Sequence, residues 1–418
     1  MKTIGILKNT VQDYAWGSLT AIPELLGQPA TGSPQAELWM GAHPIAPSQA
    51  YHDGKWESLL QEIETHPADV LGKEAAEKFG GKLPYLFKVL AAVKPLSIQA
   101  HPNSHQARKG FERENRLGIS LMSSNRNYKD NNHKPECICA LTQFWGMNGF
   151  RRIPEIIKYL GSLCKDVLED EIALVESQPN SQGLKRLFQS LLTMSPEKKT
   201  AAISSAVSHA GSFNVTRDLM ADPVFQWIHR LHAEYPKDLG ALFPALLNLF
   251  CLEPGQALYL ASGEPHAYFE GVGIELMANS DNVLRGGLTQ KHMDVPELLN
   301  VLTFQEQVPS VILPRKCSEV EWVYDTPAEE FSLSVISVFP KLSWISPAKR
   351  SAEILLCTQG QLVLDSGSGD DPIHLFKGVS VVIPASVEKY YLSGSGVCYK
   401  ASVPGSAGFV LDTRSAES

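Results

Sequence analysis

Four short segments of this 418-residue chain carry most of the polar residues whose types could do chemistry. The first is residues 97–102, SIQAHP, which ends an apolar stretch. Because side chains alternate along a β-strand, Ser97, Gln99 and His101 lie on one face of this strand and the intervening apolar residues lie on the other. Three polar groups in a row predict either the wall of a site or a solvent-exposed strand face.

A carboxylate and a second imidazole come from two later segments. Glu136 follows His133 and Lys134 at the start of an apolar strand, where an unpaired charge is costly and requires a salt bridge or a metal. His266 follows a Gly-Glu-Pro turn. A lone histidine in such a place more often has a structural role than a ligating one, so this segment alone leaves both interpretations open.

Taken together, these segments offer the ligand set of a metal site. Gln99, His101, Glu136 and His266 supply two nitrogens and two oxygens. This set suits zinc with a position left open for substrate or water, and a site without cysteine is typical of catalytic rather than structural zinc. The ligands come from three distant segments, so their spacing by itself forms no specific motif.

The fourth segment, residues 278–292, is rich in charge and glycine. Arg285 precedes two glycines, and Lys291 follows closely. A guanidinium beside an unobstructed backbone, with an ammonium nearby, could bind a phosphate or a carboxylate. The alternative is a surface loop that carries ordinary solvated charges.

Charge and cysteine content limit the classes of binding partner and the cellular location that we expect. The chain holds 37 Lys+Arg and 45 Asp+Glu, a formal net charge of −8, which argues against nucleic acid as a partner. Seven scattered cysteines without a CxxC pair do not indicate a disulfide framework. The apolar stretches are too short to span a bilayer, and the N-terminus lacks a signal-peptide core. We therefore expect a cytoplasmic protein that binds neither nucleic acid nor membrane.

Periodicity divides the chain into β and α portions. Residues 1–150 have the pattern of strands and loops, with one short helix expected over Trp56–Glu64. Residues 151–253 carry leucine and isoleucine at helical spacing and predict a bundle of helices. Short strands with turn signals then return, including a hairpin turn at Thr358–Gln361. The sequence thus predicts a mainly β protein with an inserted α-helical block, in which the strands form a sandwich or barrel such as a jelly roll.

Several motifs, in this order along the chain, resemble those of the type I mannose-6-phosphate isomerases, also called phosphomannose isomerases. They include the four segments above, and the resemblance extends to about Leu299. The further matching motifs are Tyr14-Ala-Trp-Gly17, Glu37-Leu-Trp-Met-Gly-Ala-His-Pro44 and Lys88-Val-Leu90.

The resemblance implies a domain organisation. It implies a cupin-type catalytic jelly roll over residues 1–150 and 254–310, with a helical domain of residues 151–253 inserted in it. Residues 311–418 are then expected to form a second, C-terminal jelly roll. The implied fold class is two cupin-like jelly-roll β domains plus a helical bundle.

The resemblance also implies an activity, which is the interconversion of mannose 6-phosphate and fructose 6-phosphate through an enediolate. One zinc ion (Zn2+) per chain is implied, held by the four ligands assembled above, with a small phosphorylated sugar as partner and the chain a monomer. Zinc would act as the electrophile that polarises substrate oxygens. The residues implied to be catalytic are Arg285, Asp281, Lys134 and His133, and those implied to bind substrate are Lys88, Ser97, Lys291 and Glu275.

The roles within that set stay partly open. Arg285 is the position implied to act on the enediolate, and it is also a candidate for the phosphate. The general base is open among Asp281, Lys134, His133 and Glu275, each of which needs its pKa tuned by burial or by zinc.

Two other classes of function compete with the isomerase. One is a zinc-cupin protein that binds or senses a sugar phosphate without turning it over, which should lack a workable metal or base. The other is a metal-dependent oxygenase on the same scaffold, which prefers a redox metal and more histidines than this ligand set offers.

Overall fold

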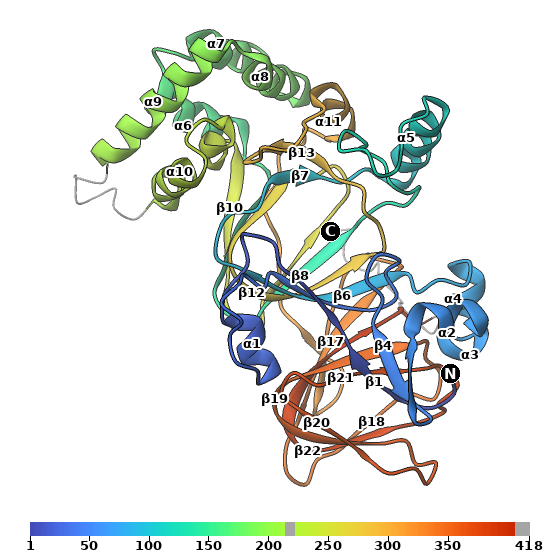
Figure 1. Cartoon of the computed structure of the whole chain (residues 1–418). Helices are drawn as coiled ribbons and strands as arrows, with labels where there is room; N and C mark the ends of the chain where they lie inside the picture. The colour runs from blue at the N-terminus through green and yellow to red at the C-terminus, as the bar shows by residue number, and fades with distance from the viewer. Residues whose placement is uncertain (214–221, 406–418) are drawn as a thin grey trace, which may run out of the picture.

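The structure is a computed structural model that describes residues 1–213 and 222–405. The segments 214–221 and 406–418, which the sequence assigns to the helical block and to the C-terminal domain, lie outside the described residues. The described strands form two large antiparallel sheets, to which helices are attached (Figure 1). The expectation of a mainly β protein with helices is confirmed.

Sheet 1 contains eleven of the described strands and carries the metal-ligand candidates. Four of its strands, β7 (Ile98–Ala100), β9 (Phe144–Phe150), β10 (Leu247–Leu252) and β13 (Leu284–Gly287), lie off the main path of strand pairing. The main path runs through β14 (Val311–Ile312), β11 (Ala257–Leu260), β8 (Glu136–Ala140), β12 (His266–Ala278), β6 (Tyr85–Ala92), β3 (Glu37–Met40) and β2 (Thr10–Gln12).

Strand β12 bends and thereby belongs to two layers of sheet 1. Its first residues pair with β7 and β9, and its last eight pair with β6. The register shifts after Tyr268, and Gly271 follows with a φ of +129°. A Cβ at Gly271 would lie 2.6 Å from the carbonyl oxygen of Gln143, so the close approach requires glycine. The bend brings the two ends of β12, and the strands that pair with them, face to face.

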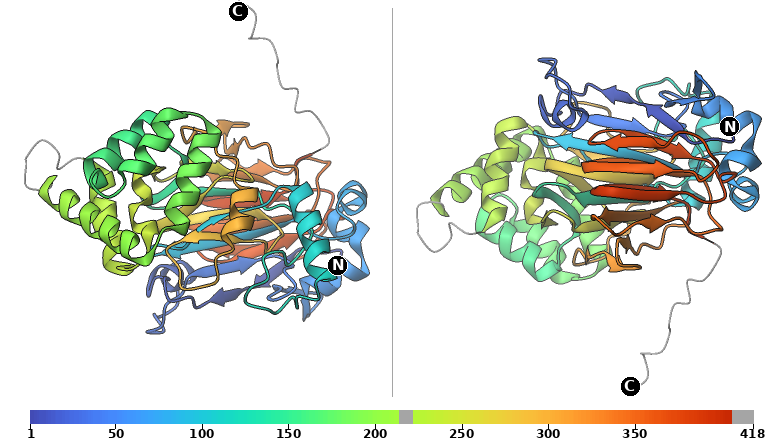
Figure 2. Two further views of the ribbon diagram at one scale, coloured as in Figure 1. Left: turned by 90° about the horizontal axis from the view of Figure 1, so that it is seen from above. Right: turned by 90° about the horizontal axis from the view of Figure 1, so that it is seen from below.

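Sheet 2 also contains eleven of the described strands, and it joins the two ends of the chain. Gly5 lies opposite Val382, so the N-terminal strands extend a sheet made by C-terminal strands, as the blue and orange-red arrows of Figure 1 and the right view of Figure 2 show. The first sixty residues therefore contribute to both sheets. The main path is β15 (Arg315–Lys316), β16 (Glu321–Tyr324), β17 (Ser332–Val338), β22 (Tyr391–Ser402), β19 (Glu353–Asp365), β21 (Ser380–Ile383), β1 (Gly5–Lys8), β4 (Gln49–His52) and β5 (Lys55–Ser58), with β18 (Trp344–Ile345) on β22 and β20 (Ile373–Phe376) on β19.

Helices occupy the chain between β9 and β10, which pair with each other. They gather at one end of the molecule (green in Figure 2). The predicted helices of this block are confirmed: α6 (Ile153–Cys164), α7 (Glu169–Ser177), α8 (Ser181–Thr193), α9 (Pro196–Phe213) and α10 (Pro223–Glu234), followed by the 3-10 helix η1 (Leu239–Ala245). Their apolar stripe shares one buried cluster with Ile98 and Ala100. The helices thus cover the apolar face of β7 and leave its polar face to the site.

Six more helices connect the remaining strands of the described residues. They are α1 (Ala21–Leu26), α2 (Leu59–Thr65), α3 (Pro67–Leu71), α4 (Lys73–Lys78), α5 (Ser104–Arg116) and α11 (Val295–Val301). None of the helices in residues 1–213 and 222–405 is long and apolar enough to cross a membrane.

One local prediction was displaced by three residues at its start and another was wrong. The helix expected over Trp56–Glu64 begins only at Leu59, because residues 55–58 pair with β4 as strand β5 across an Asp-Gly turn. The hairpin turn expected at Thr358–Gln361 is a bulge within the continuous strand β19, where Gly360 takes a φ of +71°. In both places pairing with a neighbouring strand overrides the local signal.

Candidate metal centre and active site

Two histidines and a glutamate from three strand ends meet in the interior. His101 Nε2 lies 3.3 Å from Glu136 Oε1, and His266 Nε2 lies 3.4 Å from Glu136 Oε2. All three side chains are buried. His101 follows β7, whereas Glu136 begins β8 and His266 begins β12. The bend of β12 brings these strand ends together.

The atoms that face one another at this cluster lack hydrogen-bond partners. His101 Nε2, Glu136 Oε2 and His266 Nε2 make no hydrogen bond, which is costly for buried polar atoms unless a ligand satisfies them. The other ring nitrogens are held, because His101 Nδ1 donates to the Asn282 carbonyl oxygen at 2.7 Å and His266 Nδ1 to that of Glu264 at 3.0 Å. This arrangement directs both Nε2 lone pairs inward, as in metal-ligating histidines.

The dimensions and charges of the cluster fit a zinc ion. Ligand atoms about 2.0–2.1 Å from a tetrahedral zinc lie roughly 3.3 Å apart, which matches the two separations. Burial and the neighbouring Lys134 lower the pKa of His101 to about 4, so its imidazole is neutral at neutral pH. Burial raises the pKa of Glu136, but Lys134 and His101 outweigh it and hold this pKa well below its usual value. The residues therefore present a neutral histidine ring and an ionised carboxylate.

Gln99 lies beside this cluster in a row of polar residues across four strands. It is directly opposite His266 on β12 and opposite Arg285 on β13. Residues opposite each other in antiparallel strands project to the same face. The row continues to Asn148, which lies opposite His266 from β9. The prediction that residues 97, 99 and 101 face away from the apolar core agrees with the complete burial of the alternate residues between them.

Asn148 was missed by the sequence analysis. It is buried, and its Nδ2 donates to Glu264 Oε2 at 3.1 Å while its Oδ1 makes no hydrogen bond. A single asparagine inside the strand sequence FWGMNGF gave no local signal of a site. Only its pairing opposite His266 places it in the polar row.

Lys134 and His133 diverge although they are adjacent. Lys134 is buried with its Nζ 3.1 Å from Glu136 Oε1, so it belongs to the metal-ligand cluster. The His133 ring instead contacts Glu330, with 2.6 Å between Nε2 and Oε1. The structure therefore brings Lys134 to the centre and directs His133 towards the segment before β17.

Asp281 pairs with a histidine from one of the N-terminal motifs. Its Oδ1 lies 3.4 Å from Nε2 of the buried His43. Burial raises the pKa of Asp281, but the opposing effect of His43 and Lys134 is larger. The pKa of Asp281 therefore lies below its usual value. Asp281 is thus an ionised, partly exposed carboxylate near the metal-ligand cluster. The sequence analysis assigned no role to His43.

Lys88 and Glu275 form a buried ion pair with each other. Lys88 Nζ lies 2.9 Å from Glu275 Oε2 and 3.8 Å from Glu37 Oε2. Glu37 also accepts a hydrogen bond from Trp39 Nε1 at 2.6 Å. Burial raises the pKa of Glu275, although Lys88 opposes the rise. With two carboxylates at its ammonium group, Lys88 is not a free cation for a phosphate.

Arg285 and Lys291 remain uncompensated. Neither makes an ion pair or a side-chain hydrogen bond with any described residue. Burial lowers the pKa of Arg285. Burial, Arg285 and Lys129 lower the pKa of Lys291, so Lys291 lies close enough to both other cations to be repelled by them. Lys129 is an exposed side chain that the sequence analysis missed. Ser97 is half-buried just before β7, two residues from Gln99.

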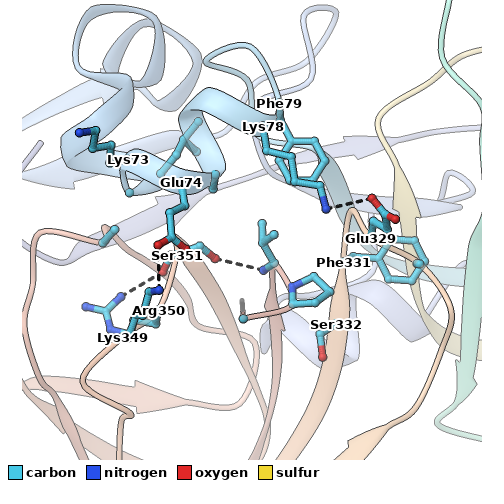
Figure 3. A pocket seen from close by; sticks show the side chains of 18 of the residues that line it. Lys73, Glu74, Lys78, Phe79, Glu329, Phe331, Ser332, Lys349, Arg350 and Ser351 are labelled. Atoms are coloured by element: carbon cyan, nitrogen blue, oxygen red, sulfur yellow. Dashed lines mark hydrogen bonds and ion pairs between the residues drawn. The ribbon is translucent and has the colours of Figure 1, made fainter. Parts of the chain in front are cut away.

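A cavity of about 1110 Å³ opens elsewhere, between α3 and α4 and the loops of sheet 2 (Figure 3). Ion pairs cross it, with Lys78 Nζ 2.9 Å from Glu329 Oε2 and Lys349 Nζ 2.8 Å from Glu74 Oε1. None of the predicted site residues lines it. The size of a cavity is therefore a poor guide to the chemistry of this protein.

Comparison with known proteins gives one consistent result. Residues 4–153 match the model of the phosphomannose isomerase type I catalytic domain. The chain is 41% identical over 393 residues to the mannose-6-phosphate isomerase of Escherichia coli. The aligned region covers 93% of this chain and 97% of that protein. It is 33% identical over 407 residues to the human enzyme of that name, covering 91% and 93%.

Solved structures agree with the sequence relatives. The mannose 6-phosphate isomerase of Salmonella typhimurium, solved with fructose 6-phosphate and zinc, matches with a TM-score of 0.87 and 39% identity over 96% of this chain and 100% of that chain. A zinc-bound mannose 6-phosphate isomerase structure matches with a TM-score of 0.88 and 38% identity over the same shares. By its sequence, its fold and its buried His-Glu-His cluster, the chain belongs to the type I phosphomannose isomerase family, the mannose-6-phosphate isomerases.

Proposed function

We propose that this protein is a zinc-dependent isomerase that interconverts mannose 6-phosphate and fructose 6-phosphate. The observation that carries the proposal is the buried cluster of His101, Glu136 and His266, whose inward atoms lack partners. A related structure of the same fold holds zinc and fructose 6-phosphate. When bound, zinc supplies a Lewis acid that polarises the substrate's oxygens.

One zinc ion per chain is held by His101, Glu136, His266 and Gln99. The amide oxygen of Gln99 is the fourth ligand, because its strand register places it beside His266. An amide is neutral and donates less strongly than imidazole or carboxylate. Gln99 therefore contributes less to metal affinity than the other three.

Three cations, Arg285, Lys291 and Lys129, serve the two ends of the substrate, which are its reacting carbons and its phosphate. Arg285 lies two strands from His266, next to Gln99, and acts on the oxygens of the reacting end. Lys291 and the neighbouring Lys129 hold the phosphate, since neither ammonium is neutralised by a described carboxylate. The hydroxyl of Ser97 supplements this phosphate site from the face that carries Gln99. Lys88 and Glu275 form a buried ion pair, and in this proposal the pair positions neighbouring groups of the substrate site.

Asp281 is the best-supported general base for the transfer of the proton between C2 and C1. It is partly exposed near the metal-ligand cluster and contacts His43. Its lowered pKa makes it a weak base, so the choice rests on its position. The other candidates are less suited because Glu275 is buried against Lys88 and His133 contacts Glu330. Lys134 contacts Glu136 and so adds a positive charge beside the metal ligands. This ammonium group can stabilise negative charge on the substrate.

The domain organisation follows the two sheets. We propose a catalytic cupin-type jelly roll in residues 1–150 and 254–310, supported by the two-layered strand β12, a helical domain of residues 151–253 and a C-terminal jelly roll of residues 311–418. Strands β1, β4 and β5 complete the C-terminal sheet from the N-terminal side. A cytoplasmic location and the absence of nucleic-acid binding stay predictions from charge and cysteine content, and a monomeric state stays a prediction from the resemblance.

A coupled isomerase assay tests the function and separates it from its two alternatives. Mannose 6-phosphate should be converted to fructose 6-phosphate, the rate should vanish after chelation, and zinc should restore it. A protein that binds mannose 6-phosphate without converting it, with zinc bound, would be the binding or regulatory alternative. Oxygen uptake in an oxygen electrode during the same reaction would favour the oxygenase.

A further inference from the structure

A second cluster of metal-ligand type lies on the edge of sheet 2, apart from the active site. It contains His52 at the end of β4, Glu57 in β5 and Glu62 in α2. The described residues contain two such groups whose ligand atoms all lie within 4.8 Å of one another, and the other is the His101 cluster. The β4–β5 hairpin and the start of α2 bring the three side chains together.

The geometry at His52 repeats that of the active-site histidines. Its Nε2 lies 3.2 Å from Glu57 Oε2 and 3.8 Å from Glu62 Oε1. The side chain is 3% exposed, and this nitrogen makes no hydrogen bond. The separations are close to those at the His101 cluster and to the spacing of ligands around a four-coordinate zinc, about 3.3 Å. A buried ring nitrogen thus faces two carboxylate oxygens at separations typical of ligands that share one ion.

The outer atoms of the same side chains are already held by other groups. His52 Nδ1 lies 3.2 Å from Asp53 Oδ2, the carboxylate–histidine contact that orients metal-bound imidazoles. Glu57 Oε1 contacts Lys55 Nζ at 2.5 Å. Glu62 Oε2 contacts the amino group of Met1, also at 2.5 Å. Each glutamate therefore has one oxygen fixed by a cation and the other directed at His52.

The charges of the cluster favour a cation rather than a closed network. Asp53, Glu57 and Glu62 bring three negative charges, whereas Lys55 and the amino group of Met1 bring two positive ones. The carboxylates therefore outnumber the cations that contact them by one, before any charge on the imidazole is counted.

We propose that His52, Glu57 and Glu62 bind a second, structural divalent ion of the zinc class. One imidazole and two carboxylates are ligands that zinc accepts, whereas calcium and magnesium prefer oxygen ligands alone. The ion joins the edge hairpin β4–β5 to α2 and to the N-terminus. It takes no part in the isomerase reaction, and the inference does not depend on the proposed function.

Metal content measured on the holoprotein tests the proposal. Purified protein equilibrated with a small excess of zinc and then desalted should hold two zinc ions per chain. Glu57→Gln and His52→Ala should each hold one and keep full isomerase activity, and His101→Ala should also hold one but lose activity. Glu64→Gln, an exposed neighbour in α2, serves as the matched control and should hold two. One ion per wild-type chain, or two in Glu57→Gln, would overturn the proposal.

Crystals of the unmodified protein provide a measurement that does not depend on the folding of a variant. Anomalous scattering recorded across the zinc absorption edge should give a peak among His52, Glu57 and Glu62 as well as one at the active site. A peak at the active site alone overturns the second site. Peaks at neither place, in protein that is active, would overturn the second site and also refute the zinc requirement of the proposed function.

Discussion

Replacing Arg285 by lysine tests whether its guanidinium stabilises charge that develops during the reaction. Arg285 lies two strands from His266, about 10 Å between backbones, with Gln99 between them. It is half-buried and has no carboxylate partner among the described residues, so its charge is available to the substrate. Lysine keeps the charge but loses the planar pair of donors.

The size of the effect follows from the number of donors lost. Removing one donor from an oxyanion in a water-poor site costs about 3 kcal/mol, which is roughly a hundredfold in rate. Uniform binding of substrate and transition state would change KM instead. We therefore expect Arg285→Lys to lower kcat by about a hundredfold or more with a much smaller change in KM.

Steady-state kinetics combined with proton exchange in deuterated water provide the assay. If Arg285 stabilises the enediolate, the variant should exchange the C2 proton of mannose 6-phosphate as slowly as it forms ketose. Rapid C2 exchange with slow ketose formation would place Arg285 after enediolate formation and refute this reasoning. An unchanged kcat with a raised KM would show that Arg285 only binds the phosphate.

Three further predictions concern the metal, the phosphate and the fold. His101→Ala and His266→Ala should each lose active-site zinc and nearly all activity while circular dichroism stays unchanged, and full zinc occupancy at this site in either variant would exclude it as a ligand. Lys291→Ala should raise the KM for mannose 6-phosphate far more than it lowers kcat, because a remote phosphate contact is largely uniform binding; an unchanged KM would remove it from the phosphate site. Gly271→Ala should lower the free energy of unfolding by about 3 kcal/mol or more through positive-φ strain and overpacking, since its Cβ would lie 2.6 Å from a backbone oxygen. Gly255→Ala, also at positive φ but with open space around it, should cost distinctly less in urea denaturation, and equal losses would contradict the steric argument.

Local sequence patterns determined the elements and the chemistry of single segments. The leucine stripe that includes Leu184 and Leu187 predicted helices, and both side chains are buried in the helical block. The alternation around Gln99 predicted a strand with one polar and one apolar face, and the buried Ile98 and Ala100 agree with it. These predictions succeed because side-chain periodicity depends only on near neighbours along the chain. The types of His101, Glu136 and His266 marked them as possible metal ligands, because zinc accepts imidazole and carboxylate groups.

Only the tertiary structure decided which of these groups meet. Lys88, which the resemblance implied to bind substrate, pairs with Glu275, 187 residues further along the chain. His52 faces Glu57 because strand β5 pairs with β4, where the local pattern had predicted a helix.

The same holds for the active site as a whole. Glu136 reaches His266 through a bend that Gly271 permits. The cation Lys129 comes close enough to Lys291 to lower its pKa, from a loop that no motif marked, and we propose that it contributes to the phosphate site. Such contacts depend on strand pairing between segments far apart in sequence, whose register is set by the packing of the whole sheet and not by any local pattern.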